Sequence, residues 1–287
     1  MDRIASLPIW KGPVDMRPIS GGITNFNFVV EDSARRYFVR LGADIPEHGV
    51  MRFNELAASK AAAAAGVSPL VVHAEEGVIV FEFIDGRTFE PSDVRRDLIR
   101  VVDLVARAHR QIPIHFRGPA LVFWVFSVIR GYGHTLSERS SPHMAKLPRL
   151  LETAQRLERE VGPIELIYGH NDLLASNFID DGARLWLVDW DYAGFNSPLF
   201  DLGGLASNNQ LVYEERDLML AHYFGGRPDG ALRRRLAAMT CASLMRETMW
   251  SMVSELFSTI DFDYPAYTAE NLARFESALV DWEAMPA

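Results

Sequence analysis

A change of sequence pattern along the chain constrains the fold more than any other feature. Up to about residue 80, short runs are rich in β-branched and aromatic residues, whereas the chain after residue 90 has mainly the apolar spacing of amphipathic helices. The length of 287 residues suits one large domain or two lobes. We therefore expect an α+β fold with two unequal lobes, residues 1–84 and residues 85–287.

The smaller lobe is expected to consist of antiparallel strands and one helix. Its strands are predicted at residues 26–30, 37–41, 70–73 and 78–83. The first two flank a short polar turn and should form a hairpin. A helix is predicted from about residue 50 to residue 65, and Gly66 stands where a left-handed glycine commonly ends a helix.

The larger lobe is expected to be mainly helical, with a few short strands. Helices are predicted at residues 92–112 and 148–161 and, with interruptions, from residue 200 onward. Short strands are predicted at residues 166–168, 177–179 and 185–188, where they would hold polar loops. Residues 118–143 are rich in aromatic residues, glycine and serine without a clear period, so we predict no element there.

Composition excludes several classes of protein. The formal charge of −9 argues against a nucleic-acid partner, because phosphate backbones bind basic surfaces, and it suits a small cationic substrate. The longest strongly apolar stretch, residues 121–129, is far below the roughly 18 to 20 residues of a membrane span. Neither a span nor a signal peptide is expected. The single cysteine, Cys241, cannot form an internal disulfide, which suits a cytoplasmic protein.

The most informative segment lies between residues 168 and 192. It places Asp172 and Asn177 five residues apart on a predicted loop, and Asp189 after the next predicted hairpin. Phosphoryl transfer to an alcohol requires a carboxylate that orients the hydroxyl and accepts its proton, together with oxygen ligands for Mg²⁺ on the nucleotide. These three residues supply that set.

The pattern His-x-Asp-x₄-Asn followed by Asp resembles the catalytic core of the protein-kinase-like small-molecule kinases, the group of choline/ethanolamine kinases and aminoglycoside phosphotransferases. The resemblance implies a two-lobed protein-kinase-like fold, with a small antiparallel-sheet lobe and a larger, mainly helical lobe. It makes Asp172 the catalytic base and His170 an orienting residue of the catalytic loop. It also makes Asn177 and Asp189 the Mg²⁺ ligands.

The resemblance extends to the expected ATP site. Arg40 stands where protein kinases have the strand lysine that pairs with phosphates and with a helix glutamate, here Glu55. Choline kinases commonly carry arginine at this position. The loop at residues 20–25 would cover the phosphates with backbone N–H groups, and the backbone of residues 81–84 would meet adenine. The expected nucleotide-binding residues are Gly21, Gly22, Thr24, Asn25, Arg40, Glu55, Phe81 and Phe83.

Further features resemble choline and ethanolamine kinases, namely His-Asn-Asp at residues 170–172, the runs at 188–192 and 200–203, and the segments 250–253 and 260–267. A quaternary ammonium group is best held by aromatic faces with carboxylates nearby. The candidate acceptor-binding residues are Asp191, Tyr192, Tyr213, Glu247, Trp250 and Tyr267. Glu247 stands where choline kinases tend to have a second tryptophan, so the site is more acidic and also suits a primary amine.

We therefore expect an ATP- and Mg²⁺-dependent kinase for the hydroxyl of a small amino alcohol, choline or ethanolamine in the first place. The alternatives are a kinase for another hydroxylated cation, such as thiamine or an aminoglycoside, and a catalytically silent nucleotide-binding pseudokinase. The sequence does not indicate the oligomeric state.

Overall fold

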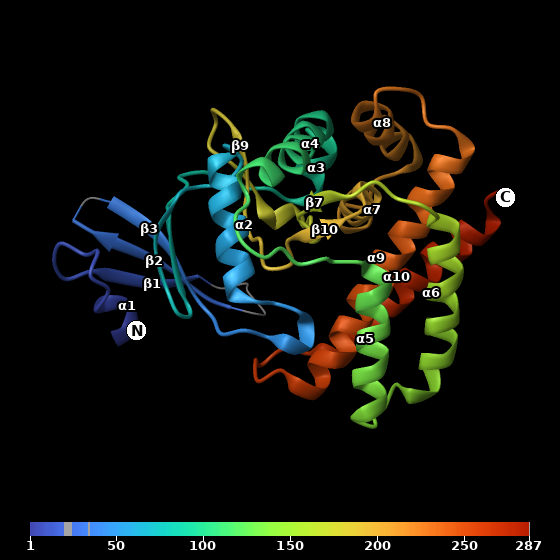
Figure 1. Ribbon diagram of the computed structural model, residues 1–287, viewed down its shortest axis with the longest axis horizontal. Coiled ribbons are helices and arrows are strands. Elements are labelled where there is room, and N and C mark those ends of the chain that lie inside the picture. The colour runs from blue at the N-terminus through green and yellow to red at the C-terminus, as the bar shows by residue number, and fades with distance from the viewer. Residues whose placement is uncertain (20–24, 34, 287) are drawn as a thin grey trace.

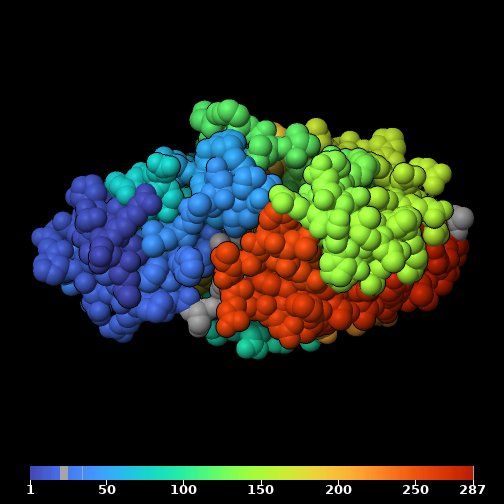
Figure 2. Space-filling view, turned by 90° about the horizontal axis from the view of Figure 1, so that it is seen from below, coloured from blue at the N-terminus to red at the C-terminus, as the bar shows by residue number. Residues whose placement is uncertain are grey.

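The structure, a computed structural model, describes residues 1–19, 25–33 and 35–286. The predicted phosphate-loop residues Gly21, Gly22 and Thr24 lie outside the described residues. A sheet and a short helix, α1 (Asp2–Ala5), form one end of an elongated molecule, and the helical part forms the rest (Figures 1 and 2).

The N-terminal sheet has five antiparallel strands in the order β1-β2-β3-β5-β4. The strands are β1 (Asp15–Ile19), β2 (Phe26–Asp32), β3 (Arg35–Leu41), β4 (Val71–Glu75) and β5 (Val78–Glu82). The four predicted strands and their hairpin are confirmed, whereas β1 was not predicted. This edge strand is almost entirely exposed and contains Pro18, so it has no alternation of apolar and polar residues to identify it.

Helix α2 (Arg52–Ala64) joins the sheet to the helical part. As predicted, the chain leaves it through Gly66, whose φ of +70° is the left-handed conformation that favours glycine. The buried side chains Ala58, Ala61 and Ala62 belong to the large core of the helical part rather than to the small core between the sheet and α1. α2 is thereby held against α4 (Leu98–His115).

The helical part contains the predicted helices and one that was not predicted. Besides α4, its helices are α3 (Pro91–Arg96), α5 (Val125–Glu138), α6 (Leu147–Val161), α7 (Pro198–Asn208), α8 (Tyr213–Phe224), α9 (Gly230–Phe257) and α10 (Tyr264–Ala284). The prediction of a single helix at residues 92–112 is wrong in one respect. The chain bends at Asp97, so this segment forms two helices, α3 and α4.

Helix α5 lies in the segment for which no element was predicted. Two glycines, Gly131 and Gly133, lower its helix propensity and obscure the apolar face. That face buries Val125, Phe126 and Ile129 and packs against α9 and α6. Tertiary packing therefore stabilises a helix that local propensity does not favour.

Two small sheets support the loops of the helical part. β7 (Ile167–Gly169) pairs with β10 (Gly194–Asn196), and β8 (Phe178–Asp180) pairs with both β6 (Arg87–Thr88) and β9 (Leu185–Leu187). The five-stranded sheet ends at Glu82, and the division into lobes at residue 84 stays a prediction. No helix in the described part of the chain has both the length and the apolar character of a membrane span.

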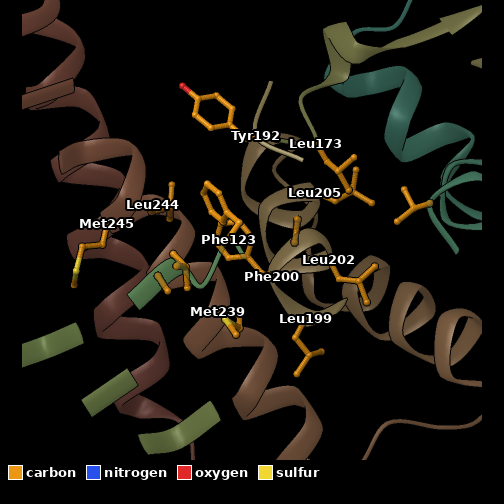
Figure 3. Close-up of a cluster of buried hydrophobic side chains, with 14 of the residues drawn as sticks. Phe123, Leu173, Tyr192, Leu199, Phe200, Leu202, Leu205, Met239, Leu244 and Met245 are labelled. Carbon is orange, nitrogen blue, oxygen red and sulfur yellow. The ribbon is translucent and has the colours of Figure 1, made fainter. Parts of the chain in front are cut away.

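The two helices behind the loops, α7 and α9, pack unusually closely. α7 is buried from Pro198 to Ser207 and contacts α9, and Figure 3 shows Phe200 of α7 beside Phe123 in the core. A Cβ atom on Gly203 would lie only 2.9 Å from the backbone nitrogen of Thr240, whereas one on Gly204 would meet the Ser243 hydroxyl at 3.5 Å. The close approach of α7 and α9 therefore requires glycine at position 203 but not at position 204.

We predict that Gly203→Ala destabilises the protein, while Gly204→Ala does not. The first methyl group must push two helix backbones apart, which costs roughly 1 to 3 kcal/mol. The second makes an ordinary contact and gains the helix propensity of alanine, up to about 1 kcal/mol. Urea unfolding of both variants measures the difference, and equal free energies of unfolding would contradict the packing argument.

Candidate functional site

A loop between β7 and β8 carries the predicted catalytic residues, and one carboxylate of α7 fixes its backbone. Asp201 accepts hydrogen bonds from the backbone N–H groups of His170 (2.8 Å) and Asn171 (2.7 Å). Asn171 adopts a left-handed conformation, with φ of +66°, and its amide donates to the carbonyl oxygen of Tyr192 at 2.9 Å. The loop is thus tied both to the core helix and to the segment after β9.

His170 lies inside this loop and contacts it on both sides. Its Nε2 lies 2.9 Å from the carbonyl oxygen of Val188, and its Nδ1 accepts from the backbone N–H of Asp172 at 3.3 Å. A carbonyl oxygen only accepts, so Nε2 carries the proton. Burial lowers the pKa of His170 and keeps the ring neutral. The residue orients the loop and holds no charge there.

Asp172, two residues after His170, lines a small cavity together with Arg246 and Glu247 of α9. Desolvation by the surrounding protein raises the pKa of Asp172 to about 7, the guanidinium of Arg246 opposes the rise, and the carboxylate of Glu247 adds to it. At neutral pH this carboxyl group can therefore both hold and release a proton, as a general base must.

Asn177 and Asp189 come together at the open end of the β8–β9 hairpin. The backbone N–H of Val188 donates to the carbonyl oxygen of Asn177 at 3.0 Å, and the Asn177 amide donates to the carbonyl oxygen of Asp172 at 2.9 Å. Asp189 has a φ of +72° and binds Arg40 through only one carboxylate oxygen. An amide oxygen and a carboxylate oxygen are hard ligands, so the pair fits a magnesium ion.

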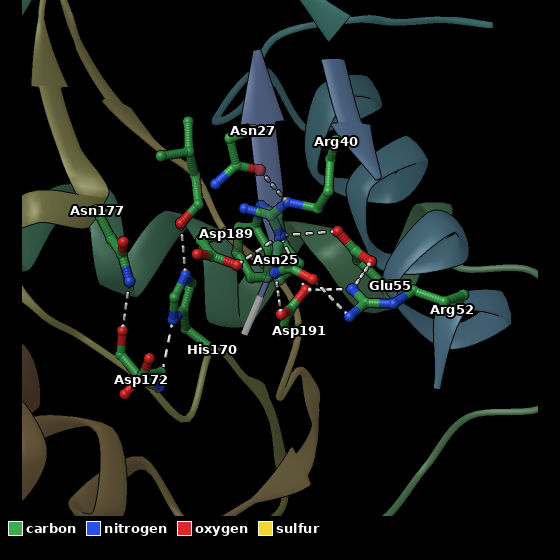
Figure 4. Close-up of polar contacts among 12 residues, drawn as sticks. Asn25, Asn27, Arg40, Arg52, Glu55, His170, Asp172, Asn177, Asp189 and Asp191 are labelled. Atoms are coloured by element: carbon green, nitrogen blue, oxygen red, sulfur yellow. Dashed lines mark hydrogen bonds and ion pairs between the residues drawn. The ribbon is translucent and has the colours of Figure 1, made fainter. Parts of the chain in front are cut away.

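Arg40 of β3 lies at the centre of a buried ionic network (Figure 4). Its Nη1 is 2.8 Å from Glu55, 2.7 Å from Asp189 and 2.8 Å from Asp191. Burial alone would lower the pKa of Arg40, but the three carboxylates outweigh burial and raise it well above its ordinary range. The predicted pairing of Arg40 with Glu55 is present, and Glu55 is completely buried.

Arg52 and Asn25 complete the network. Arg52, in the first turn of α2, binds Glu55 at 2.5 Å and Asp191 at 3.0 Å, and it donates to the side-chain oxygen of Asn25 at 2.6 Å. The Asn25 amide donates to Asp191 at 2.8 Å. The carboxylate of Asp191, which we expected to bind the substrate cation, is therefore paired with two protein cations instead. Arg52 was not predicted, although its i,i+3 spacing to Glu55 is a recognisable signal.

The two phenylalanines expected near adenine lie at the end of the sheet. Phe81 packs against Phe38 of β3 with ring centroids 6.0 Å apart, and Phe83 lies beneath the guanidinium of Arg36 at 4.4 Å. Both side chains are half-buried. Their contacts hold β5 against β3, and the contact of this backbone with a nucleotide stays a prediction.

Four of the six predicted acceptor-binding residues lie together. The indole N–H of Trp250 donates to the Tyr192 hydroxyl at 2.8 Å, the Tyr267 hydroxyl donates to Glu247 at 2.8 Å, and the rings of Trp250 and Tyr267 meet edge to face. Tyr213 does not join them. It lies on α8, is 58% exposed, and its ring contacts Arg233.

Two residues that sequence reasoning did not assign to the site cover the aromatic faces. His48 stacks on Trp250 with ring centroids 4.8 Å apart, and burial lowers the pKa of His48 to about 3, so it stays neutral. The guanidinium of Arg246 lies 4.5 Å from the centre of the Tyr192 ring. A protein cation therefore already lies on one face of the expected aromatic cage, and the binding of an amine by these rings stays a prediction.

Comparison with known proteins agrees with this arrangement. A model of the choline/ethanolamine kinase family matches residues 16–219. Human ethanolamine kinase 2 is 26% identical over an alignment that covers 91% of this chain and 75% of that protein.

Two solved structures share the fold. A choline/ethanolamine kinase family protein from Mesorhizobium loti is 28% identical, with a TM-score of 0.79 over 97% of this chain and 92% of the other. The choline kinase LicA from Streptococcus pneumoniae, at 21% identity, has a TM-score of 0.80 over 98% and 97%. The predicted two-lobed protein-kinase-like α+β fold is confirmed. Because the family model covers most of its length, the chain belongs to the choline/ethanolamine kinase family.

Proposed function

We propose that this protein transfers the γ-phosphoryl group of ATP, bound with Mg²⁺, to the hydroxyl group of a small amino alcohol. The observation that carries the proposal is the position of Asp172. It lies between the oxygen pair of Asn177 and Asp189 on one side and the cavity beside Glu247 on the other. A carboxyl group placed between a metal-phosphate site and an amine site suits a phosphotransferase.

In the proposed reaction, Asp172 orients the acceptor hydroxyl and takes its proton as the oxygen attacks the γ-phosphorus. The bond from that phosphorus to the leaving oxygen of ADP breaks, and the proton stays on Asp172 until solvent removes it. A pKa of about 7 matches this task, because the group is substantially ionised at neutral pH yet basic enough to accept the proton. Ordering of the loop by Asp201 and His170 keeps the carboxyl group in place.

Asn177 and Asp189 would hold Mg²⁺, which supplies neutralising charge to the nucleotide phosphates when bound. Arg40 lies next to this pair and is fixed by Glu55, so it would place a positive charge near the same phosphates. Gly21, Gly22 and Thr24, which lie outside the described residues, and Asn25 stay the proposed phosphate-covering residues. The backbone near Phe81 and Phe83 stays the proposed adenine contact.

The amine would lie near Glu247, Trp250 and Tyr267. A trimethylammonium group has no N–H to donate and depends on open aromatic faces. His48 covers a face of the Trp250 ring, and Arg246 covers a face of the Tyr192 ring. The Glu247 carboxylate, in contrast, can accept an N–H bond. These contacts favour a primary ammonium group, as in ethanolamine, over choline.

Measuring ADP release tests the proposal. Purified protein with Mg²⁺-ATP should release ADP in the presence of ethanolamine or a related amino alcohol, and faster than with choline, thiamine or an aminoglycoside. Asp172→Asn should lower kcat by a factor of about 10² to 10⁴, because it removes the proton acceptor, with little change in ATP affinity. Asp103→Asn, on the exposed face of α4, is the matched control and should leave kcat unchanged.

The outcomes separate the alternatives. ATP binding without turnover on any alcohol would favour the silent nucleotide-binding protein. An Asp172→Asn variant that keeps more than about a tenth of the wild-type kcat would remove Asp172 from the role of base.

The rate should also depend on pH in a defined direction. Burial raises the pKa of Asp172 to about 7, so the carboxyl group becomes protonated, and loses its capacity to accept a proton, as the pH falls below 7. We predict that kcat/KM for the amino alcohol at saturating Mg²⁺-ATP falls about tenfold per pH unit below 7 and levels off above it. A profile that stays flat from pH 5 to pH 8 would contradict this assignment.

A further inference from the structure

Arg52 is bonded at every nitrogen of its guanidinium group. Its Nε donates to the carbonyl oxygen of Ala43 at 2.9 Å, and its Nη2 donates to the side-chain oxygen of Asn25 at 2.6 Å. Its Nη1 lies 2.5 Å from the carboxylate of Glu55 and 3.0 Å from that of Asp191 (Figure 4). Three bonded nitrogens fix the orientation of the planar group. Arg52 therefore holds together the chain after β3, helix α2, the residue before β2 and the segment after β9.

Arg52 binds two of the three carboxylates that surround Arg40. The Nη1 of Arg40 carries two hydrogens, yet three carboxylate oxygens lie within 2.8 Å of it. Glu55 and Asp191 are the two that also bind Arg52, and their side chains are only 1% and 4% exposed. Asp189 is 32% exposed and, within the part of the chain that the structure describes, forms its ion pair with Arg40 alone. Asp189 can therefore leave Arg40 for a metal ion while Arg52 keeps the two buried carboxylates paired.

The charge of this network depends on Arg52. Burial raises the pKa of Asp191, and the guanidinium groups of Arg40 and Arg52 oppose the rise. Three carboxylates and two guanidinium groups give the network one net negative charge. A magnesium ion on Asp189 would make the net charge positive, which attracts nucleotide phosphates. Without Arg52 the same ion would only bring the network to neutrality.

From these contacts we propose that Arg52 is a positioning residue of the nucleotide site, which sets the affinity for the magnesium-nucleotide complex. It acts through Asp191 and Asn25, whose side chains are also hydrogen-bonded to each other at 2.8 Å, and not by contact with the acceptor. The inference rests on the proposed phosphotransferase function and deepens its nucleotide side. Because the proposed acceptor-binding residues come from α9 and α10, a change at Arg52 should alter the binding of nucleotide and not that of the amino alcohol.

Calorimetric titration with Mg²⁺-ADP, without an acceptor, measures this affinity directly. Arg52→Met removes the charge and every hydrogen bond of the group, so Kd should rise by a factor of about 10 to 100, the contribution of a hydrogen bond to a charged group. Arg52→Lys keeps the charge but loses the planar fork, so its Kd should lie between those of the wild type and Arg52→Met. In turnover with saturating nucleotide, the KM for ethanolamine should stay within about twofold of the wild-type value.

A compensating substitution tests whether Arg52 acts through Asp191. Arg52→Met combined with Asp191→Asn removes one charge of each sign and leaves the net charge of the network unchanged. This double variant should bind Mg²⁺-ADP more tightly than Arg52→Met alone, by roughly threefold or more, because no buried carboxylate is left uncompensated. Arg233→Met is the matched control, because Arg233 is also partly buried and pairs with a carboxylate outside the network, that of Asp217. Its Kd for Mg²⁺-ADP should equal that of the wild type.

The outcomes are distinct. An Arg52→Met variant with the wild-type Kd for Mg²⁺-ADP would overturn this inference and leave the proposed function intact, as would an equal rise in the Kd for nucleotide and the KM for ethanolamine. A double variant that binds no more tightly than Arg52→Met would also overturn it, because the effect would then not run through Asp191. If Arg52→Met does not fold, Arg52→Lys and the double variant are compared with the wild type, since both keep the buried charges balanced. Failure of the wild-type protein to bind Mg²⁺-ADP and to release ADP with any amino alcohol would overturn the proposed function and this inference with it.

Discussion

The arrangement of the site depends on one buried cation, the guanidinium of Arg40. It binds carboxylates from α2 and from the loop after β9, and so it ties the N-terminal sheet to both. Removing one member of such a buried network leaves the others uncompensated, which typically costs 3 to 5 kcal/mol or more. Arg52 supports the same carboxylates from the first turn of α2. The relative placement of sheet, helix and metal-ligand pair is therefore set by electrostatics that only a folded chain can satisfy.

Inside the helical part, one buried carboxylate fixes the position of the catalytic loop. Asp201 binds two backbone N–H groups of the catalytic loop and lies 2.8 Å from Nε2 of His109. Burial alone would raise the pKa of Asp201, but these hydrogen bonds and the nearby histidines outweigh it and lower the pKa. Asp201 sits on α7, whose distance from α9 is set by Gly203. Core packing, through a single carboxylate, thus determines where the reactive carboxyl group of Asp172 stands.

Sequence reasoning singled out neighbouring residues where chemistry fixes residue types at fixed spacing. Asp172, Asn177 and Asp189 were found in one short segment, and the Arg40–Glu55 pair, which the structure contains, followed from the resemblance to protein kinases. It failed where the signal exists only in three dimensions. Arg246 reaches the site because α9 places it over a ring that comes from another part of the chain, and α5 forms because α9 and α6 cover its face. Neither relation leaves a periodicity or a motif in the sequence.

The electrostatics of the acceptor side link substrate choice to the chemical step. Arg246 lowers the pKa of Asp172, and Glu247 raises it. An ammonium group bound beside Glu247 would neutralise the second influence and leave the first. The bound amine would therefore lower the pKa of Asp172, so that more of this carboxyl group is ionised at neutral pH when the acceptor is in place. The residue that receives the amine would in this way also adjust the base on which the transfer depends.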